Sequence, residues 1–184
     1  MAPAPGLMTV DEYFAHTPYS LKPMELIYGA LRVADSPMPR HQSAVLQLLL
    51  ALDGHVRPRD LGRMWVAPLD VVLNDRLALI VQPDLFFISN ERSWIVTDRV
   101  RGAPDLVVEV LSPNPRIGKT GERVRWFEKN GVRECWLVNQ DDRSVTVIKF
   151  ENHRETSRRS FLRHDSIVSA ILPEFTSSLD EILD

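Results

Sequence analysis

Two carboxylates interrupt apolar segments of this sequence at positions where an isolated charge is costly. Glu109 lies inside "GAPDLVVEVLSPN" (residues 102–114), and Asp84 follows Pro83 at the start of "DLFFIS". Burying an unpaired carboxylate carries a large free-energy penalty. Glu109 must therefore be paired with a cation, bind a metal ion, or face a cleft at the end of a strand.

The spacing of the acids suggests which of them can act together. Asp105 and Glu109 share one face of a strand but lie about 13 Å apart at ~3.3 Å per residue, too far to share a small ion. An antiparallel pairing that places residue 88 opposite 105 also places Asp84 opposite Glu109, with Cβ atoms about 5 Å apart. We therefore expect these two acids on one face, at one end of a strand pair.

Two carboxylates this close repel each other, and the pKa of one rises unless a cation lies between them. Mg²⁺ or Mn²⁺ is an economical solution, because such ions take one or two carboxylates and complete their coordination with water and substrate phosphate oxygens. Ions bound in this way commonly catalyse phosphodiester hydrolysis. A metal ion shared by Asp84 and Glu109 is therefore one interpretation of this arrangement, for which the spacing alone is weak evidence.

The elements that would position these acids are read from hydrophobic periodicity and turn residues. We expect an α/β fold in which strands 62–73 and 79–89 precede the strand that carries Glu109, and in which an amphipathic helix follows over 117–131. Before these strands we expect a helix capped by Thr9 and Glu12, two strands about Tyr28 and Gly29, and a helix over 41–57. A polar loop with one helical turn is expected over 89–103, and a hairpin of 132–140 with 144–150. The chain is then expected to continue with a charged connection over 151–160, a short strand near 161–169, and a C-terminal helix capped by Ser177 or Ser178.

The composition limits the class of protein. With 184 residues the chain fits one domain, which we divide into N-terminal strands and helix (8–60), a core with the acids (61–150) and a C-terminal extension (151–184). No apolar run approaches the ~20 residues of a membrane span, and no secretory signal is evident. Cys135 is the only cysteine, which excludes intramolecular disulfides and predicts a cytoplasmic protein. A net charge of -3 argues against a uniformly basic nucleic-acid binder but leaves room for a local basic face.

Several segments together resemble a known family. "MELIYGALRV", "PRHQSAVLQLLLAL", "APLDVVL", "VQPDLFFIS", "GAPDLVVEVLSPN" and "GERVRWFEKNGVRECWLV" follow one another in the order seen in the Uma2 family, also called DUF820, over roughly residues 8–150. That family is regarded as a branch of the PD-(D/E)XK nuclease superfamily. The resemblance implies a restriction-endonuclease-like core, which is a mixed β-sheet flanked by helices.

The resemblance also implies roles for particular residues. Asp84 and Glu109 would be the two acids that hold Mg²⁺, and Glu25 would be an acid contributed from near the N-terminus. The superfamily's lysine, two residues after the second acid, is replaced here by Leu111. The resemblance implies that a lysine from the following helix takes over this role, and this chain has Arg123 at that position. Lys119 lies one helical turn earlier and is a possible substitute. Arginine supplies fixed positive charge but exchanges protons poorly.

Each of these residues also has a structural interpretation. Glu109 could be a buried acid paired with Arg123 or Arg125, and Asp84 could be a turn residue after Pro83. His41 could lie near the cleft at a helix start, and Asp70 is a weaker candidate for the same cleft or for a buried ion pair.

The function that these expectations favour is a Mg²⁺-dependent endonuclease acting on DNA, with a water activated by the ion as nucleophile. A catalytically degenerate binding module for nucleic acid or protein is the main alternative, and a subunit that needs a partner chain is another. We also expect a homodimer, because strand 144–150 is predicted near a sheet edge and enzymes that cut duplexes often pair two sites.

Overall fold

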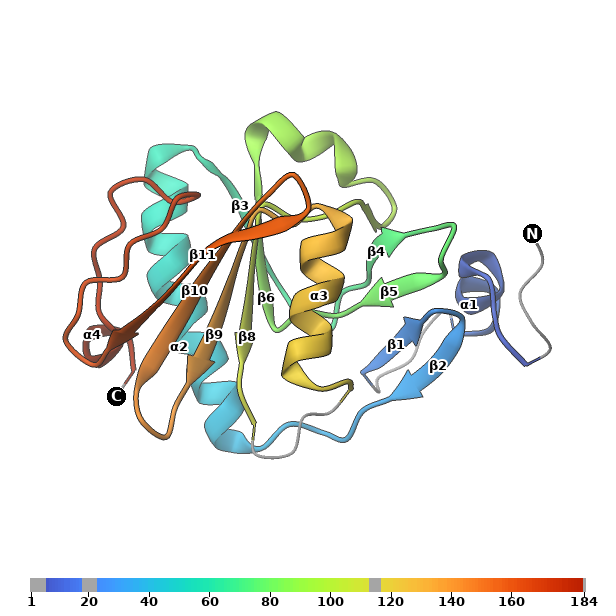
Figure 1. Cartoon of the computed structure of the whole chain (residues 1–184), viewed down its shortest axis with the longest axis horizontal. Coiled ribbons are helices and arrows are strands. Elements are labelled where there is room, and N and C mark those ends of the chain that lie inside the picture. The colour runs from blue at the N-terminus through green and yellow to red at the C-terminus, as the bar shows by residue number, and fades with distance from the viewer. Residues whose placement is uncertain (1–5, 18–22, 113–116, 184) are drawn as a thin grey trace.

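The computed structural model describes residues 6–17, 23–112 and 117–183. These residues form two mixed sheets with helices on both faces of the larger one (Figure 1). The small sheet has the strand order β2-β1-β5-β4-β7, and the large sheet has the order β11-β10-β9-β8-β6-β3. This confirms the expected α/β class, with a mixed sheet flanked by helices.

The elements have the following bounds. The small sheet contains β1 (Met24–Ile27), β2 (Ala30–Val33), β4 (Val71–Asn74), β5 (Leu79–Val81) and β7 (Val100–Arg101). The large sheet contains β3 (Gly62–Val66), β6 (Leu85–Ser89), β8 (Leu106–Val110), β9 (Glu134–Asn139), β10 (Ser144–Glu151) and β11 (Arg154–Leu162). The helices are α1 (Val10–His16), α2 (Pro39–Val56), α3 (Thr120–Asn130) and α4 (Leu179–Ile182), with short 3₁₀ helices at Arg57–Arg59 and Asn90–Ile95.

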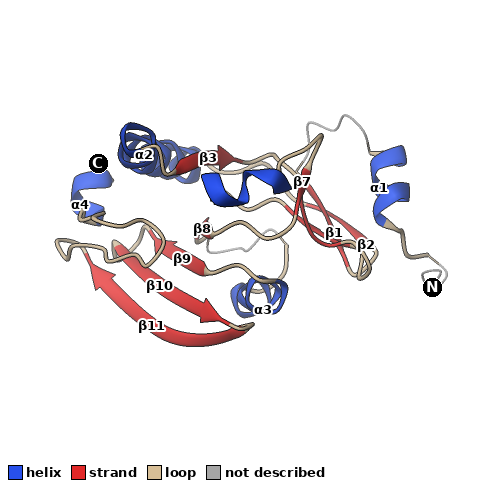
Figure 2. Cartoon of the chain, turned by 90° about the horizontal axis from the view of Figure 1, so that it is seen from above, coloured by secondary structure: helices blue, strands red, loops and turns tan. Residues whose placement is uncertain are grey.

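The large sheet is buried on both faces, because its central strands alternate between two hydrophobic clusters. Leu106, Val108 and Val110 of β8 pack with α2 and the C-terminal segment, whereas Val107 packs with α3 and the small sheet. Figure 2 shows α2 and α3 on opposite sides of β8. Since side chains alternate along a strand, Glu109 shares the α3 face with Val107.

The two expected long strands are each interrupted and divided between the sheets. Residues 62–73 form β3 and β4 on either side of Pro68, and residues 79–89 form β5 and β6 on either side of Pro83. Proline has no backbone N–H to give to a strand ladder, which is consistent with both interruptions. The chain therefore passes from the large sheet to the small one and back, and Gln82 and Asp84 lie on the return crossing.

The C-terminal part differs from expectation. Residues 151–160 are not a charged connection, because Arg154–Leu162 forms β11, which pairs antiparallel along the whole of β10. Strand 144–150 is therefore not at the sheet edge, and the edge-pairing argument for a homodimer is wrong in that form. The N-terminal capping box of Thr9 with Glu12 and the Ser178 cap of α4 are confirmed. Among the described residues, no helix is long and apolar enough to cross a bilayer.

Candidate active site

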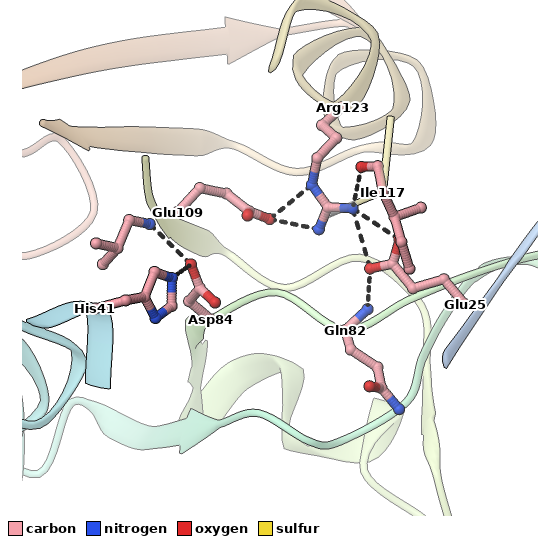
Figure 3. Close-up of polar contacts among 8 residues, drawn as sticks. Glu25, His41, Gln82, Asp84, Glu109, Ile117 and Arg123 are labelled. Atoms are coloured by element: carbon pink, nitrogen blue, oxygen red, sulfur yellow. Dashed lines mark hydrogen bonds and ion pairs between the residues drawn. The ribbon is translucent and has the colours of Figure 1, made fainter. Parts of the chain in front are cut away.

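Four charged side chains from four separate elements meet beside the crossing between the two sheets (Figure 3). Glu25 comes from β1 of the small sheet, Asp84 from the segment before β6, Glu109 from β8 and Arg123 from α3. β1 reaches this place because it pairs with β5, with Leu26 opposite Ile80. Glu25 of the small sheet and Glu109 of the large sheet therefore both contact Arg123, which belongs to α3.

The register of β6 and β8 brings Asp84 and Glu109 to the same end of the strand pair. Leu85 lies opposite Val108 and Phe87 opposite Leu106, so the same antiparallel register, continued by one residue, places Asp84 opposite Glu109. The backbone N–H of Val110 donates to Asp84 Oδ2 at 2.9 Å. This hydrogen bond fixes the Asp84 carboxylate at the end of β8 and confirms the register expected from the sequence.

Arg123 bridges two of the three acids. Its Nη2 and Nε donate to Glu109 Oε1 at 2.7 and 3.2 Å, and its Nη1 donates to Glu25 Oε2 at 2.7 Å and Oε1 at 3.0 Å. All three side chains are largely buried, with exposed fractions of 4% for Glu25, 11% for Arg123 and 14% for Glu109. Charge-assisted hydrogen bonds of this kind are among the stronger polar contacts in proteins.

Burial controls the ionisation of Glu109. Removal from water raises the pKa of its carboxyl group to about 7, an effect that the Arg123 charge opposes and that the negative charges of Asp84 and Glu25 reinforce. For Arg123, burial alone would lower the pKa, but the carboxylates of Glu109 and Glu25 outweigh burial and raise it. Glu109 is therefore able to exchange a proton near neutral pH, whereas Arg123 stays a fixed cation.

Asp84 is held from a second direction by the start of α2. His41 Nε2 lies 3.2 Å from Asp84 Oδ2, and both side chains are buried. Pro39 at the first position of α2 is typical of a helix start, and His41 follows two residues later, within the first turn. The structure thus places His41 at the cleft, in contact with a candidate metal ligand.

A hydrogen-bonded chain leads from Glu25 away from the cleft. The backbone N–H of Gln82 donates to Glu25 Oε1 at 2.7 Å, and Gln82 Nε2 donates to Asp70 Oδ1 at 2.8 Å. Tyr13 of α1 also donates to Asp70 Oδ1, at 3.1 Å. Burial raises the pKa of Asp70, although the hydrogen bonds from Gln82 and Tyr13 oppose that effect. Asp70 therefore supports the site through Gln82 instead of joining the acids themselves.

The acids line a cavity of about 80 Å³. Glu25, His41, Asp84, Glu109 and Arg123 all contribute to its wall. Because a water needs roughly 10–15 Å³ of such volume, the cavity has room for an ion with several waters. Lys119 is not among the described residues that line it. It is exposed at the start of α3, where its backbone N–H donates to Glu122 Oε2 at 3.0 Å.

The donor set suits a hard divalent ion that is bound partly by water and substrate. Among the described residues there is no group of three or more His, Cys, Asp or Glu side chains that could hold a metal ion by themselves. Mg²⁺ is usually held by one or two carboxylates plus waters and phosphate oxygens, so Asp84 and Glu109 beside a small cavity fit that mode. Arg123 donates to Glu109 Oε1, so Oε2 is the oxygen of Glu109 that these two hydrogen bonds do not use.

Comparisons with known proteins identify the family and a similar fold. The profile of the Uma2 family, described as "Putative restriction endonuclease", matches residues 10–180. The chain belongs to the Uma2 family. The crystal structure of a "putative nuclease belonging to DUF820" from Anabaena variabilis ATCC 29413 is similar, with a TM-score of 0.77, 21% sequence identity, and coverage of 95% of this chain and 97% of that one. No curated protein matches the sequence.

At the position where the sequence resemblance implied a lysine, this Uma2 protein has the apolar side chain of Leu111. Leu111 lines the cavity, and its backbone N–H donates to Val138 O at 2.7 Å. Arg123 is the only lysine or arginine among the described cavity-lining residues, and the sequence analysis gave it as one of two possible arginine partners for Glu109. Arg125 is exposed, and its Nε donates to Gly121 O at 3.2 Å. Gln82 was not singled out by the sequence, and a glutamine between two strands carries no signal that would have marked it.

Proposed function

We propose that this Uma2 protein is a Mg²⁺-dependent endonuclease that hydrolyses phosphodiester bonds of DNA. The observation that carries the proposal is the placement of Asp84 opposite Glu109, both on the wall of one cavity that also contains Arg123. The proposed partner is DNA, and the proposed location of the protein is the cytoplasm. The similar protein from Anabaena variabilis is described as a "putative nuclease", which favours the same class of reaction.

In the proposed site Asp84 and Glu109 would hold the ion. When bound, Mg²⁺ would supply positive charge to a phosphate oxygen and would make a nearby water more acidic. Val110 N–H and His41 hold Asp84 in place, while Arg123 orients the Oε1 atom of Glu109. Because Glu109 must be ionised to bind a cation, and its pKa is about 7, it gives up a proton when the ion binds near neutral pH.

Arg123 would act through its charge and would transfer no proton. Its guanidinium is held between Glu25 and Glu109 and lies 5.8 Å from the ring centre of Phe127, so it has little freedom to move. A fixed cation in a poorly hydrated cavity stabilises negative charge that develops on a transferring phosphate. Glu25 would be a positioning residue for Arg123, since it accepts two hydrogen bonds from Nη1.

Nicking of supercoiled plasmid by the purified protein, with Mg²⁺ or Mn²⁺ and with an EDTA control, tests this proposal. Glu109→Gln and Asp84→Asn remove the charge of a proposed ligand while nearly keeping its shape, and Glu91→Gln removes an exposed acid outside the cavity as a matched control. We expect ion-dependent nicking by wild type and by Glu91→Gln, and loss of nicking in both site variants. Equal nicking by wild type and Glu109→Gln would contradict the proposal.

A second function is favoured by one feature of the site. Arg123 already neutralises Glu25 and Glu109 through hydrogen-bonded ion pairs, and the motif lysine is absent at Leu111, so the acids are satisfied without an ion. A binding module for nucleic acid that retains the fold without catalysis would have such a site. Calorimetric titration with Mg²⁺ separates the two: the nuclease binds the ion through Asp84 and Glu109, and the binding module does not.

A homodimer stays part of the proposal, because two copies would present one site to each strand of a duplex. One edge available for pairing is β11, whose outer side carries no further strand among the described residues. Sedimentation equilibrium of the purified protein would give the oligomeric state directly.

A further inference from the structure

A second cavity adjoins the candidate active site and has no role in the chemistry described above. Its volume is about 190 Å³, and it shares Pro23, Gln82 and Asp84 with the wall of the first cavity. Its other walls come from the loop before α2, from α2 itself and from the segment between β3 and β4. A substrate strand with one phosphate at Asp84 and Glu109 would therefore bring its adjoining nucleotide to this second cavity.

The lining of the second cavity suits a neutral group with flat faces. Three proline rings and two small or branched apolar side chains form most of the wall, and the polar groups are the hydroxyl of Ser36 and the amides of Gln42 and Gln82. No lysine or arginine occurs among the described residues that line it, and Asp84 adds negative charge. A phosphate would be repelled here, whereas an uncharged ring with hydrogen-bonding edges would be accepted.

Gln82 supplies an acceptor that lacks a donor. Its Nε2 donates to Asp70 Oδ1 at 2.8 Å, which turns the amide oxygen to the other side. That oxygen is buried, and no described residue donates a hydrogen bond to it. Figure 3 shows the side-chain amide of Gln82 pointing away from Arg123. Gln82 lines the second cavity, and because a buried acceptor without a donor is costly, a rotation of its amide that brings the oxygen to an N–H group of a ligand would relieve that cost.

The size of the cavity fits one ring system. An apolar cavity of about 150 Å³ in another protein holds benzene, so about 190 Å³ accommodates a planar heterocycle but not a stacked pair. Nucleobases combine two flat apolar faces with N–H donors at the edge, and glutamine amides are common readers of such edges. A base can enter a pocket of this kind only when it has left the helical stack.

We propose that the second cavity receives one nucleobase next to the phosphate at the carboxylate site, so that the substrate is a strand with an unstacked base. This inference rests on the proposed nuclease function for the identity of the strand. Single-stranded or locally distorted DNA is then bound more tightly than regular duplex, because an intact duplex must first extrude the base. Gln42 and Gln82 contact the base edge, and the proline rings cover its faces.

Titration of ¹⁵N-labelled protein with deoxynucleosides, followed by NMR of the side-chain amides, tests the proposal without any cleavage. Each deoxynucleoside, which carries no phosphate, is added to about 10 mM, enough to fill a site of millimolar affinity. Deoxyribose 5-phosphate serves as the ligand without a base. Ser36→Trp fills the cavity from an exposed loop position, and Ser43→Trp places the same side chain on an exposed position of α2 that does not line it.

We expect at least one deoxynucleoside to shift the amide signals of Gln42 and Gln82, with binding weakened by about tenfold or more in Ser36→Trp and unchanged in Ser43→Trp. Deoxyribose 5-phosphate should leave both signals in place. Absence of shifts with every deoxynucleoside, or equal shifts with deoxyribose 5-phosphate, would overturn the proposal.

The same variants separate this proposal from the nuclease function. If plasmid nicking depends on Glu109 but deoxynucleosides do not bind and Ser36→Trp cleaves single strands like wild type, the base cavity is refuted and the nuclease stands. If deoxynucleosides bind at Gln42 and Gln82 and the protein does not nick DNA, the cavity is supported and the nuclease is refuted.

Discussion

The pKa of Glu109 predicts that the metal-free protein loses stability as the pH rises. The carboxyl group has a pKa of about 7 in the folded protein, against an ordinary value of 4.5, because it is buried beside Asp84 and Glu25. Between these two values the unfolded chain loses the proton while the folded protein keeps it. The folded state therefore binds more protons in this range, and its stability falls as the pH increases.

The size of the effect follows from the interval between the two pKa values, which corresponds to about 3 kcal/mol in total at ~1.36 kcal/mol per pH unit. Between about pH 5 and about pH 8, roughly 2 to 3 kcal/mol of this should be lost, since a small part is already lost at pH 5. Above the folded pKa the group is ionised in both states and contributes no further change. The other acids are the same in wild type and in a variant at position 109, so their effect on the pH dependence of stability largely cancels when the two are compared.

Urea denaturation in EDTA at several pH values measures the effect, with Glu109→Gln as the variant that cannot titrate. Glu109→Gln also removes the charge that Arg123 is paired with, but the resulting loss of stability is similar at every pH. The readout is therefore the difference between the two proteins in how the free energy of unfolding changes with pH. We expect the free energy of unfolding of wild type to fall by about 2 to 3 kcal/mol more than that of Glu109→Gln. Parallel curves for the two proteins would refute the assignment of a raised pKa to Glu109.

Four further predictions concern the ion, the ion pairs and the core. Mg²⁺ affinity should fall about tenfold per pH unit below pH 7, because Glu109 must lose its proton before it binds the ion. In that range, calorimetry in two buffers should detect about one proton released per bound ion. An affinity that does not depend on pH would contradict this. Arg123→Met should lower the free energy of unfolding by about 3–5 kcal/mol, and Arg123→Lys by less, in urea titrations. Phe127→Ala, at a fully buried position, should cost about 3–5 kcal/mol in the same assay, and a cost below about 1 kcal/mol would be inconsistent with the packing of α3. Glu134→Ala should leave Trp136 Nε1, the Ser169 hydroxyl and the Ala170 N–H without their acceptor, and limited proteolysis should then remove the C-terminal segment faster than in wild type.

The sequence predicted the central strand pair well because both strands are apolar and their register has one solution that places the acids together. The register of Leu85 with Val108 follows from that reasoning. Helix α3 was also predictable, since its apolar positions recur at helical spacing and Gly131 ends it with a φ of 93°. Local patterns of this kind are set by residues close in the chain, so a single sequence contains them.

The division of the strands between two sheets was harder to predict. Pro68 and Pro83 break the strands, but a proline alone does not say whether the chain continues in the same sheet. β11 was missed for a different reason. Its residues are exposed except for Phe161, so the segment has no apolar face, and its strand conformation depends on pairing with β10. Edge strands often carry charges in this way, so hydrophobic alternation in the sequence does not predict them.

The candidate site shows the same limit at the level of single residues. Asp84 and Glu109 were found because acids in apolar strands are conspicuous, but the choice between Arg123 and Arg125 depends on which face of α3 meets β8. The contacts of His41 with Asp84 and of Gln82 with Glu25 join residues more than 40 positions apart. No local pattern encodes such pairs, so only the folded arrangement reveals them.

The balance of charge in the site is the physical reason for proposing a divalent ion as its ligand. Three carboxylates, from Glu25, Asp84 and Glu109, face one guanidinium, from Arg123, so the ionised cluster carries two excess negative charges. Without an ion, part of this excess is removed by keeping Glu109 protonated near neutral pH, which is what its raised pKa means. One Mg²⁺, in the site proposed above, would neutralise the whole excess and would allow Glu109 to ionise. A lysine in place of Arg123 could itself lose a proton when buried, whereas arginine keeps its charge. Of the bonded pair Glu109 and Arg123, Glu109 is therefore the partner whose charge changes near neutral pH, and its protonation is the point at which pH and a bound ion would compete.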